Sequence, residues 1–326
     1  MLSGVDSASL TSRFPPVELA HLPTRVEPMH RLGAVLGLDA LWVKRDDCTG
    51  LGVGGNKVRK LEFDLAAGMK EGADCVVCGG VVQSNAARQV AAACAKLGIE
   101  CHLGIMRGRL GTTEAGYEET GNVLLDRLFG AVIHDIPWDE DRNRRLREIV
   151  AGLREKGRQP YLVPYGASDA LGAMGYVVAA EEISRDLPEV RWLVHASGSA
   201  GTQPGLVAGL LALGHPARVI GIDVDAQPER VRADVCRVGQ EVAVLLGVGD
   251  RWRDELVNVA GDWSAGAYGL ADGGTEEAIR LAARTEALAL DPVYTGKGMA
   301  GLIGLARQGR FGTGAWPGRV PLWRER

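Results

Sequence analysis

Residues 192–213 read WLVHASGSAGTQPGLVAGLLAL, and this stretch is the clearest indication of the fold. Its apolar start, 192–196, is typical of a buried strand and passes directly into the glycine-rich segment 197–202. Pro204 suits the first turn of a helix, where a missing N–H costs no hydrogen bond, and the apolar residues after it predict a helix. A strand, a glycine loop and a helix in this order predict one half of a βαβ unit.

The same alternation continues on both sides of this stretch. Short apolar runs that predict strands lie at 41–43, 75–78, 101–105, 131–136, 161–163, 192–196, 218–224 and 255–259. Helical patterns lie between them, for example at 85–97, 122–129, 171–187 and 275–288. Strands that alternate with helices at these lengths imply mostly parallel sheets covered by helices on both faces. The sequence therefore predicts an α/β protein.

Length and composition place the chain among ordinary globular proteins. Its 326 residues exceed what one simple domain usually holds, so we expect two lobes. The net charge is −4, and the arginines within 142–147 follow an acidic run, which is typical of a solvated helix face. We therefore expect no nucleic-acid partner.

Features that would send the chain to a membrane or out of the cell are not found in the sequence. No apolar stretch approaches the length of a membrane span, and residues 1–16 lack the basic start and apolar core of a signal peptide. We expect a cytoplasmic protein, in which the six cysteines are thiols. Cys75 and Cys78 have the spacing of a redox motif, but they lie in an apolar run and no second pair follows, so we interpret them as buried structural residues and predict no metal site.

Residues 50–57, GLGVGGNK, admit two interpretations. The segment matches the G-x-G-x-x-G pattern of dinucleotide sites, but that pattern needs a strand running straight into the glycines, and the polar residues 44–49 intervene. The alternative centres on Lys57, which follows glycines that would let a carbonyl compound approach closely. A lysine at a helix start beside other cations has a lowered amine pKa and suits Schiff-base formation with an aldehyde cofactor.

The segment 197–202, SGSAGT, has the properties of an anion site. It combines exposed amides, hydroxyls and the positive end of the helix that follows. With no lysine in the segment, one phosphate group is a better guest than a triphosphate. A plain tight turn between strand and helix is the alternative. A lysine and a phosphate cradle on separate loops are together what pyridoxal 5'-phosphate needs.

Several long motifs resemble one known family. They are KRDD at 44–47, GGNKVRKLE at 54–62, QSN at 83–85, SGSAGT at 197–202 and DPVY at 291–294. In this order they resemble the family of D-cysteine desulfhydrase, 1-aminocyclopropane-1-carboxylate deaminase and L-cysteate sulfo-lyase. The resemblance runs from about residue 14 to about residue 311. It implies pyridoxal 5'-phosphate as cofactor and a tryptophan synthase β-like fold (fold type II) with two open, twisted, mostly parallel sheets.

The resemblance also implies an organisation and a setting for the chain. A large cofactor-binding domain would comprise residues 1–56 and 168–326, with a small domain, 57–167, inserted in it. The protein would be a homodimer that acts on a small amino acid.

Roles follow from the resemblance position by position. Lys57 would bind the cofactor as a Schiff base and move a proton at the substrate's α-carbon. Ser84, with the neighbouring amides of Asn85 and Ala86, would hold the substrate carboxylate. Tyr268 and Tyr294 would be paired tyrosines of the pocket. The residues implied to bind the cofactor are Lys57, Lys60, Asn85, Gly198, Ser199, Ala200, Gly201, Thr202 and Thr295.

Thr295 bears on the choice of reaction. The deaminases of the family carry a glutamate at this position, and a hydroxyl cannot keep the cofactor's ring nitrogen protonated as well as a carboxylate can. Thr295 therefore favours α,β-elimination from a β-substituted alanine, as in D-cysteine desulfhydrase, over the opening of a cyclopropane ring. L-cysteate sulfo-lyase stays open as an alternative, because residues 48–51 and 198–203 resemble that branch.

Two departures from the family pattern limit these expectations. Ala86 replaces a larger polar residue, which affects substrate contacts or the width of the pocket. The C-terminal residues 312–326 lack the family's His-Thr-Gly-Gly turn, and Pro317, Pro321 and Arg324 suit a central strand poorly. A protein that binds the cofactor but has impaired catalysis is therefore a further alternative.

Overall fold

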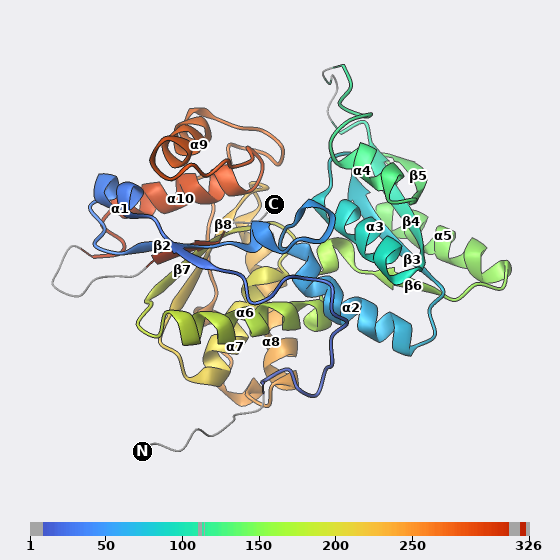
Figure 1. Ribbon diagram of the computed structural model, residues 1–326, viewed down its shortest axis with the longest axis horizontal. Coiled ribbons are helices and arrows are strands. Elements are labelled where there is room, and N and C mark those ends of the chain that lie inside the picture. Colours follow the sequence, from blue (N-terminus) through green and yellow to red (C-terminus); the bar gives the residue numbers. More distant parts are fainter. Residues whose placement is uncertain (1–8, 110–112, 114, 313–319, 324–326) are drawn as a thin grey trace. The chain divides into compact units, whose positions relative to one another are not determined.

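The computed structural model describes residues 9–109, 113, 115–312 and 320–323 and divides into two compact units (Figure 1). Unit 1 comprises Met1–Pro15, Arg25–Lys44 and Ala173–Trp323. Unit 2 comprises Pro16–Thr24 and Arg45–Gly172. Each unit contains one sheet, and the domain bounds expected from the sequence stay a prediction.

Unit 1 is built on a six-stranded sheet in the order β1-β2-β10-β7-β8-β9. β1 pairs antiparallel with β2, and the other pairs are parallel. The strands are β1 (Val26–Pro28), β2 (Leu41–Lys44), β7 (Trp192–Ser197), β8 (Arg218–Asp223), β9 (Asn258–Ala260) and β10 (Val320–Trp323). β7 and β8 are buried along almost their whole length, as strands covered on both faces should be.

Helices cover both faces of this sheet. α1 (His30–Leu36), α9 (Gly273–Glu286) and α10 (Thr295–Arg307) lie on one face, and α6 (Ala170–Asp186), α7 (Thr202–Leu213) and α8 (Pro228–Leu245) lie on the other (Figure 1). Short 3-10 helices, η4 (Gly249–Arg251) and η5 (Asp254–Leu256), precede β9. Ile220 and Ile222 of β8 pack with Met299, Leu302 and Ile303 of α10 in one apolar core.

Two expectations about strands in unit 1 were wrong. The predicted strand 255–259 begins three residues later, at Asn258, because η5 occupies the start of that segment. Pro321, expected to suit a central strand poorly, lies in β10 between β2 and β7. β10 is in register with β2 from Val320 onward, but its register with β7 starts only at Leu322, so Pro321 is paired on one side alone, as a proline at a sheet edge is. Pro317 and Arg324 lie outside the described residues.

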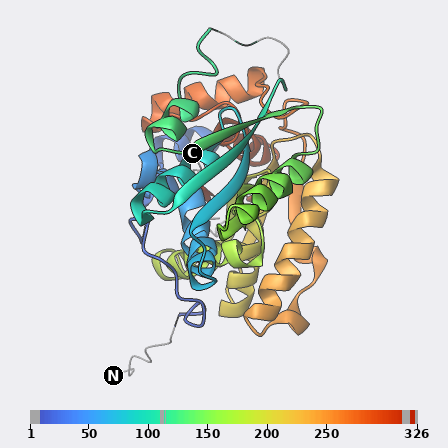
Figure 2. The ribbon, with the colours of Figure 1, turned by 90° about the vertical axis from the view of Figure 1, so that its right-hand side faces the viewer.

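Unit 2 is built on a parallel four-stranded sheet in the order β5-β4-β3-β6. Its strands are β3 (Cys75–Val81), β4 (Glu100–Arg107), β5 (Val132–Pro137) and β6 (Pro160–Val163). Its helices are η1 (Asp46–Cys48), η2 (Leu51–Val53), α2 (Lys57–Lys70), α3 (Asn85–Leu97), α4 (Asn122–Leu128), α5 (Arg142–Glu155) and η3 (Tyr165–Ala167). α2 and α3 pack on one face in a large apolar cluster, and α5 packs on the other face (Figure 2).

Two sequence interpretations in unit 2 are confirmed. Cys75 and Cys78 are buried thiols in β3, and burial raises their pKa values to about 11 and about 12. The arginine run forms the exposed start of α5, where Arg144 makes ion pairs with Glu140 and Glu148. Among the helices that the structure describes, none combines the length and the apolar character needed to cross a bilayer.

Candidate active site

The glycine loop before Lys57 is shaped by close packing against its own chain. Gly54 has φ 76°, and a Cβ added there would lie 2.0 Å from the carbonyl oxygen of Asp47. Val53 has φ 67°, a left-handed conformation that β-branched residues rarely adopt. η1 separates the end of β2 from the glycines, η2 lies among them, and α2 begins two residues after the last glycine. The dinucleotide interpretation is therefore wrong, since the strand does not run into the loop.

Side chains from the same unit hold this loop in place. The hydroxyl of Thr49 accepts a hydrogen bond from the amide of Gly55 (2.9 Å) and donates one to its carbonyl (2.8 Å). The guanidinium of Arg88, a buried residue of α3, donates to the carbonyls of Gly52 and Gly54. These bonds fix where α2 starts, and so fix the position of Lys57. Arg88 was not predicted from the sequence, where its only signal was a single arginine in an alanine-rich helix.

Lys57 is the first residue of α2 and is partly exposed. Its Nζ lies 3.3 Å from Oδ1 of Asn56. The backbone amides of this first turn have no acceptors within the helix, so they give the lysine a positive environment. An amine in such a position is suited to bond covalently with an aldehyde.

Lys60, one turn further along α2, has different surroundings. It is fully buried, and its Nζ lies 3.4 Å from the carbonyl oxygen of Gly166 and 3.5 Å from Oγ of Ser168. Burial and the neighbouring Asp169 hold the pKa of Asp64 well above its usual range. The charge of Lys60 partly opposes this rise. These contacts lie within unit 2, and the expected role of Lys60 toward the cofactor stays a prediction.

The residues expected to bind substrate stand at the start of α3, at the carboxyl end of β3. Ser84 is the N-cap, and its Oγ accepts a hydrogen bond from the amide of Ala87 (3.2 Å). The amides of Asn85 and Ala86 are the first two of the helix, where acceptors within the helix are lacking. A carboxylate is a suitable acceptor for such amides. The side chain of Ala86 is buried.

A chain of amide side chains orients Asn85. Its Oδ1 accepts a hydrogen bond from Nδ2 of Asn122 (2.9 Å), which also donates to the carbonyl of Gln83 (3.0 Å). The backbone amide of Asn122 donates in turn to Oε1 of Gln83 (2.9 Å). With its oxygen engaged in this way, Asn85 presents its NH₂ group as a donor, which fits a phenolate oxygen on a cofactor ring.

The segment 198–202 connects β7 to α7 in unit 1. Ala200 has φ 57°, a strained conformation for a residue with a side chain. A Cβ added at Gly198 would lie 3.3 Å from the side chain of Val224. Thr202 is the first residue of α7, so its hydroxyl and that of Ser199 accompany the unsatisfied amides of the helix start. This donor set fits a phosphate dianion.

The two tyrosines singled out in the sequence lie together. The hydroxyl oxygens of Tyr268 and Tyr294 are 2.7 Å apart, and the rings meet edge to face with their centroids 5.6 Å apart. Tyr294 immediately precedes α10, and Tyr268 lies in the loop after β9. Either oxygen can be the donor. The hydroxyl that accepts can then donate its own hydrogen to a third group. Their catalytic role stays a prediction.

The hydroxyl of Thr295, the first residue of α10, is hydrogen-bonded within its own chain segment. Its hydroxyl donates to Oδ2 of Asp291 (2.6 Å) and accepts from the Asp291 amide (2.8 Å). The same carboxylate also accepts hydrogen bonds from the amides of Val293, Tyr294 and Thr295. Because a hydroxyl carries one proton, Thr295 can offer a further partner only a lone pair while this bond lasts. These hydrogen bonds to Asp291 were not predicted from the sequence.

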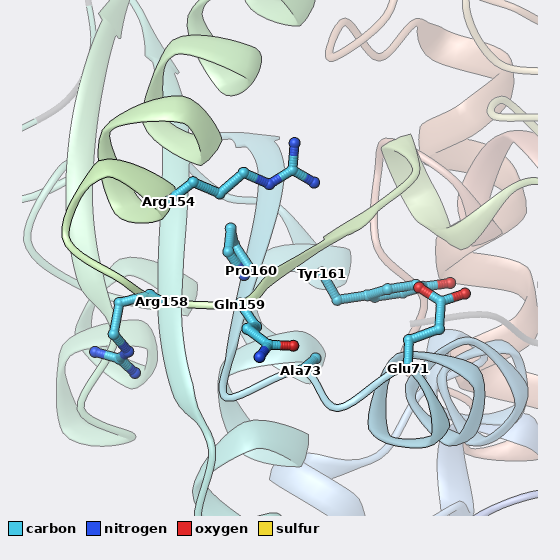
Figure 3. A pocket seen from close by; sticks show the side chains of 7 residues that line it. All are labelled: Glu71, Ala73, Arg154, Arg158, Gln159, Pro160 and Tyr161. Carbon is cyan, nitrogen blue, oxygen red and sulfur yellow. The ribbon is translucent and has the colours of Figure 1, made fainter.

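Unit 2 also has a surface pocket (Figure 3). It is lined by Glu71, Ala73, Arg154, Arg158, Gln159, Pro160 and Tyr161. β6 begins at Pro160, so the pocket lies at the amino ends of the strands, whereas Ser84 and Asn85 follow the carboxyl end of β3. Parallel sheets bind ligands at their carboxyl ends. This pocket is therefore no part of the candidate site.

Comparison with known proteins identifies sequence relatives over most of the chain. Residues 17–316 match the family model described as "Pyridoxal-phosphate dependent enzyme". The chain is 40% identical over 303 residues to D-cysteine desulfhydrase of Salmonella paratyphi B, with 92% of this chain and 91% of that protein covered. The identity and coverage are the same for D-cysteine desulfhydrase of Salmonella newport.

Solved structures share the fold. A structure described as an ACC deaminase homologue is 34% identical, with a TM-score of 0.86 over 97% of this chain and 93% of the other. O-acetylserine sulfhydrylase isoform 3 from Entamoeba histolytica is 13% identical, with a TM-score of 0.64 over 100% of this chain and 89% of that one, and this shows likeness of fold alone. The expected fold, tryptophan synthase β-like with two mostly parallel sheets, is confirmed.

Proposed function

This chain belongs to the family of pyridoxal-phosphate dependent enzymes, and from that premise we propose that it is a lyase that converts D-cysteine and water to pyruvate, ammonia and sulfide. The observation that carries the proposal is 40% identity to D-cysteine desulfhydrase over 92% of the chain. Thr295 supports it, because this position lacks the carboxylate that favours the deaminase reaction.

The donor groups of this chain fit pyridoxal 5'-phosphate. Lys57 supplies the amine for its aldehyde, the amide NH₂ of Asn85 supplies a donor for its ring oxygen, and the loop 198–202 supplies amides and hydroxyls for its phosphate. When bound, the cofactor supplies an electron-accepting ring that makes the α-proton of an attached amino acid acidic.

The protein's own residues then carry out binding and proton transfer. Ser84 and the amides of Asn85 and Ala86 hold the substrate carboxylate and so choose which α-bond is aligned for cleavage. Nζ of Lys57 removes the α-proton. The hydroxyls of Tyr268 and Tyr294 bind at the substrate's β-substituent, and a proton from this pair goes to the departing sulfur, which leaves as sulfide.

The opening of aminocyclopropane carboxylate is the second candidate, favoured by the likeness to the ACC deaminase homologue. The decisive experiment incubates the purified enzyme with D-cysteine, L-cysteate or aminocyclopropane carboxylate and measures sulfide, sulfite, pyruvate and 2-oxobutyrate. We expect sulfide and pyruvate from D-cysteine. Sulfite from L-cysteate as the faster reaction would replace the proposal with a sulfo-lyase, and 2-oxobutyrate would replace it with a deaminase. Cofactor binding without any of these products would indicate impaired catalysis.

Two further parts of the proposal concern the setting of the enzyme. We propose a homodimer, which the family resemblance supports and light scattering on the purified protein tests; a monomer at assay concentration contradicts it. We also propose a cytoplasmic location. Its support is that the cysteines of the described chain are free thiols, which suits a reducing compartment. Cell fractionation tests it, and recovery outside the cytoplasm contradicts it.

A further inference from the structure

Lys297 is a buried charge inside an otherwise apolar helix. It is the third residue of α10, TGKGMAGLIGLAR, and no other charged residue occurs in that helix before Arg307. Its side chain is fully buried. A buried ammonium is costly unless its hydrogen bonds are satisfied, so its surroundings must compensate for the lost water.

Three backbone carbonyls surround this ammonium. Nζ donates to the carbonyl oxygens of Ser264 (2.6 Å), Ala267 (2.7 Å) and Val224 (3.0 Å). An ammonium has three N–H donors and no acceptor, so these carbonyls match its donors in number. Converging backbone carbonyls are also how proteins hold a dehydrated potassium ion. The carbonyls around Nζ of Lys297 thus have the chemistry of ligands to a monovalent cation.

The carbonyls belong to segments next to the candidate active site of unit 1. Ser264 and Ala267 flank a left-handed turn at Ala265 (φ 55°) and Gly266 (φ 78°), and Tyr268 follows directly. Two carbonyls brought together by such a turn repel each other unless a positive group lies between them. Ala265 also carries the strain of a left-handed residue with a side chain, which persists only where neighbouring contacts enforce it.

Val224 provides the connection to the loop 198–202. It directly follows β8, its amide donates to the carbonyl of Ser197 (3.1 Å), and its side chain limits the space at Gly198. The loop of Tyr268 is thus fastened twice to the first turns of α10, by Lys297 through carbonyls and by the hydroxyl of Tyr294. Removing the ammonium would release one of these two points.

We propose that Lys297 is a positioning residue that takes the place of a bound monovalent cation, holding the loop 264–268 so that Tyr268 meets Tyr294. The enzyme accordingly needs no added potassium or sodium ion. The inference rests on the proposed function only in treating Tyr268 as part of the active site. The carbonyl site itself does not depend on which substrate the enzyme uses.

Two variants separate a cation site from general core packing. Lys297→Ala removes the ammonium and leaves space for an ion, whereas Lys297→Met removes the charge and fills the space. The melting temperature of each, and of the wild type, is measured with and without cofactor in potassium, sodium or tetramethylammonium chloride at equal ionic strength. We expect potassium to raise the melting temperature of Lys297→Ala alone, with no difference among the salts for the wild type or Lys297→Met.

Activity gives the second readout on the holoenzymes. In tetramethylammonium chloride we expect both variants to lose about tenfold in kcat, the loss that goes with leaving buried carbonyls unpaired. Potassium should restore part of this loss in Lys297→Ala and none in Lys297→Met. A purely structural lysine would make both variants equally unstable in every salt.

Several results would overturn the inference. They are a wild type that requires potassium or sodium, a Lys297→Ala variant that responds to no small cation, or an equal response in Lys297→Met. If Lys297→Ala does not fold, the salt series on the wild type still tests the inference, since a requirement of the wild type for potassium or sodium would contradict it. Failure of the proposed function is separate, because it is an absence of product from D-cysteine in the wild type.

Discussion

The two glycine-rich loops of this protein use glycine for different reasons. In the loop 50–55 the carbonyls of Gly52 and Gly54 accept hydrogen bonds from Arg88, and Gly54 has no space for a side chain beside Asp47. In the loop 198–202 the backbone leads into α7 and presents amides and hydroxyls. Carbonyls of the first loop are bound within its own unit, which places Lys57, whereas the second loop is the one proposed to bind an anion. Two loops of similar glycine content therefore differ in which backbone groups matter: carbonyls in the first and amides in the second.

The largest effect is expected at the residue that the first loop places. Lys57→Ala should abolish covalent attachment of the cofactor and lower sulfide production by about three orders of magnitude or more, because it removes both the amine and the base. The measurement is the absorbance band of the lysine-bound cofactor together with sulfide release. Lys70→Ala, at the exposed end of the same helix, is the control and should behave as the wild type. An unchanged band in Lys57→Ala would remove Lys57 from the site.

The next effect tests the packing of the first loop. Gly54→Ala should destabilise the protein by roughly 3 kcal/mol, because alanine would have to keep a glycine-only conformation and displace Asp47. Urea unfolding measures this change. Gly98→Ala is the matched control, since Gly98 has φ 70° but nothing within 4 Å, and about 1 kcal/mol is expected there. Equal losses for the two variants would mean that packing against Asp47 does not matter.

A third prediction concerns a buried carboxyl that faces Arg88. Burial raises the pKa of Asp126 to about 7, partly opposed by the charge of Arg88, and the structure gives its oxygens no hydrogen-bond partner among the described residues. The folded protein therefore keeps this proton at pH values where the unfolded chain has lost it. Stability from this group is complete below the ordinary aspartate pKa and is lost as pH rises toward 7.

Asp126→Asn removes the titration and should remove this pH dependence. We expect the variant to gain stability relative to the wild type, by roughly 1 to 2 kcal/mol, between pH 5 and pH 8. Urea unfolding at both pH values measures it, with Asp139→Asn as a control on an exposed aspartate. A difference between variant and wild type that does not change with pH would show that Asp126 is ionised throughout.

The smallest effect belongs to the second loop. Thr202→Val keeps the shape of the side chain and removes one hydroxyl donor, so it should weaken cofactor binding about five- to tenfold without affecting the fold. Titration of the apoenzyme with pyridoxal 5'-phosphate gives the dissociation constant. Thr285→Val, which removes a hydroxyl bonded to a carbonyl within α9, should leave that constant unchanged. If Thr202→Val also leaves it unchanged, the amides alone hold the phosphate.

Several features of the fold and the site were predictable because they are local. Alternating apolar and helical segments predicted the parallel sheets, and the start of α2 at Lys57 follows from the glycines before it. The hydroxyl and amide donors at 84–86 and 198–202 follow from strand–loop–helix order, because helix starts always lack internal acceptors.

Other features depend on partners far away in the chain. Pro321 argued against a central strand, yet β10 lies in the middle of the sheet, between β2 and β7. Arg88 and Lys297 gave only the signal of a charged residue among small or apolar ones in a helix, which does not reveal the carbonyls they bind.

The sequence by itself determined the class of fold and the type of cofactor, since these rest on periodicity and on motifs of adjacent residues; that Lys57 is the attachment residue stays a prediction. Only the tertiary structure decided how the two glycine loops differ, because the difference depends on which distant side chains donate hydrogen bonds to the loop carbonyls. Arg88 of α3 donates to a carbonyl of the first loop, whereas the second loop leads directly into the start of α7. A buried polar group must find a partner, and only the folded chain determines which one is within reach.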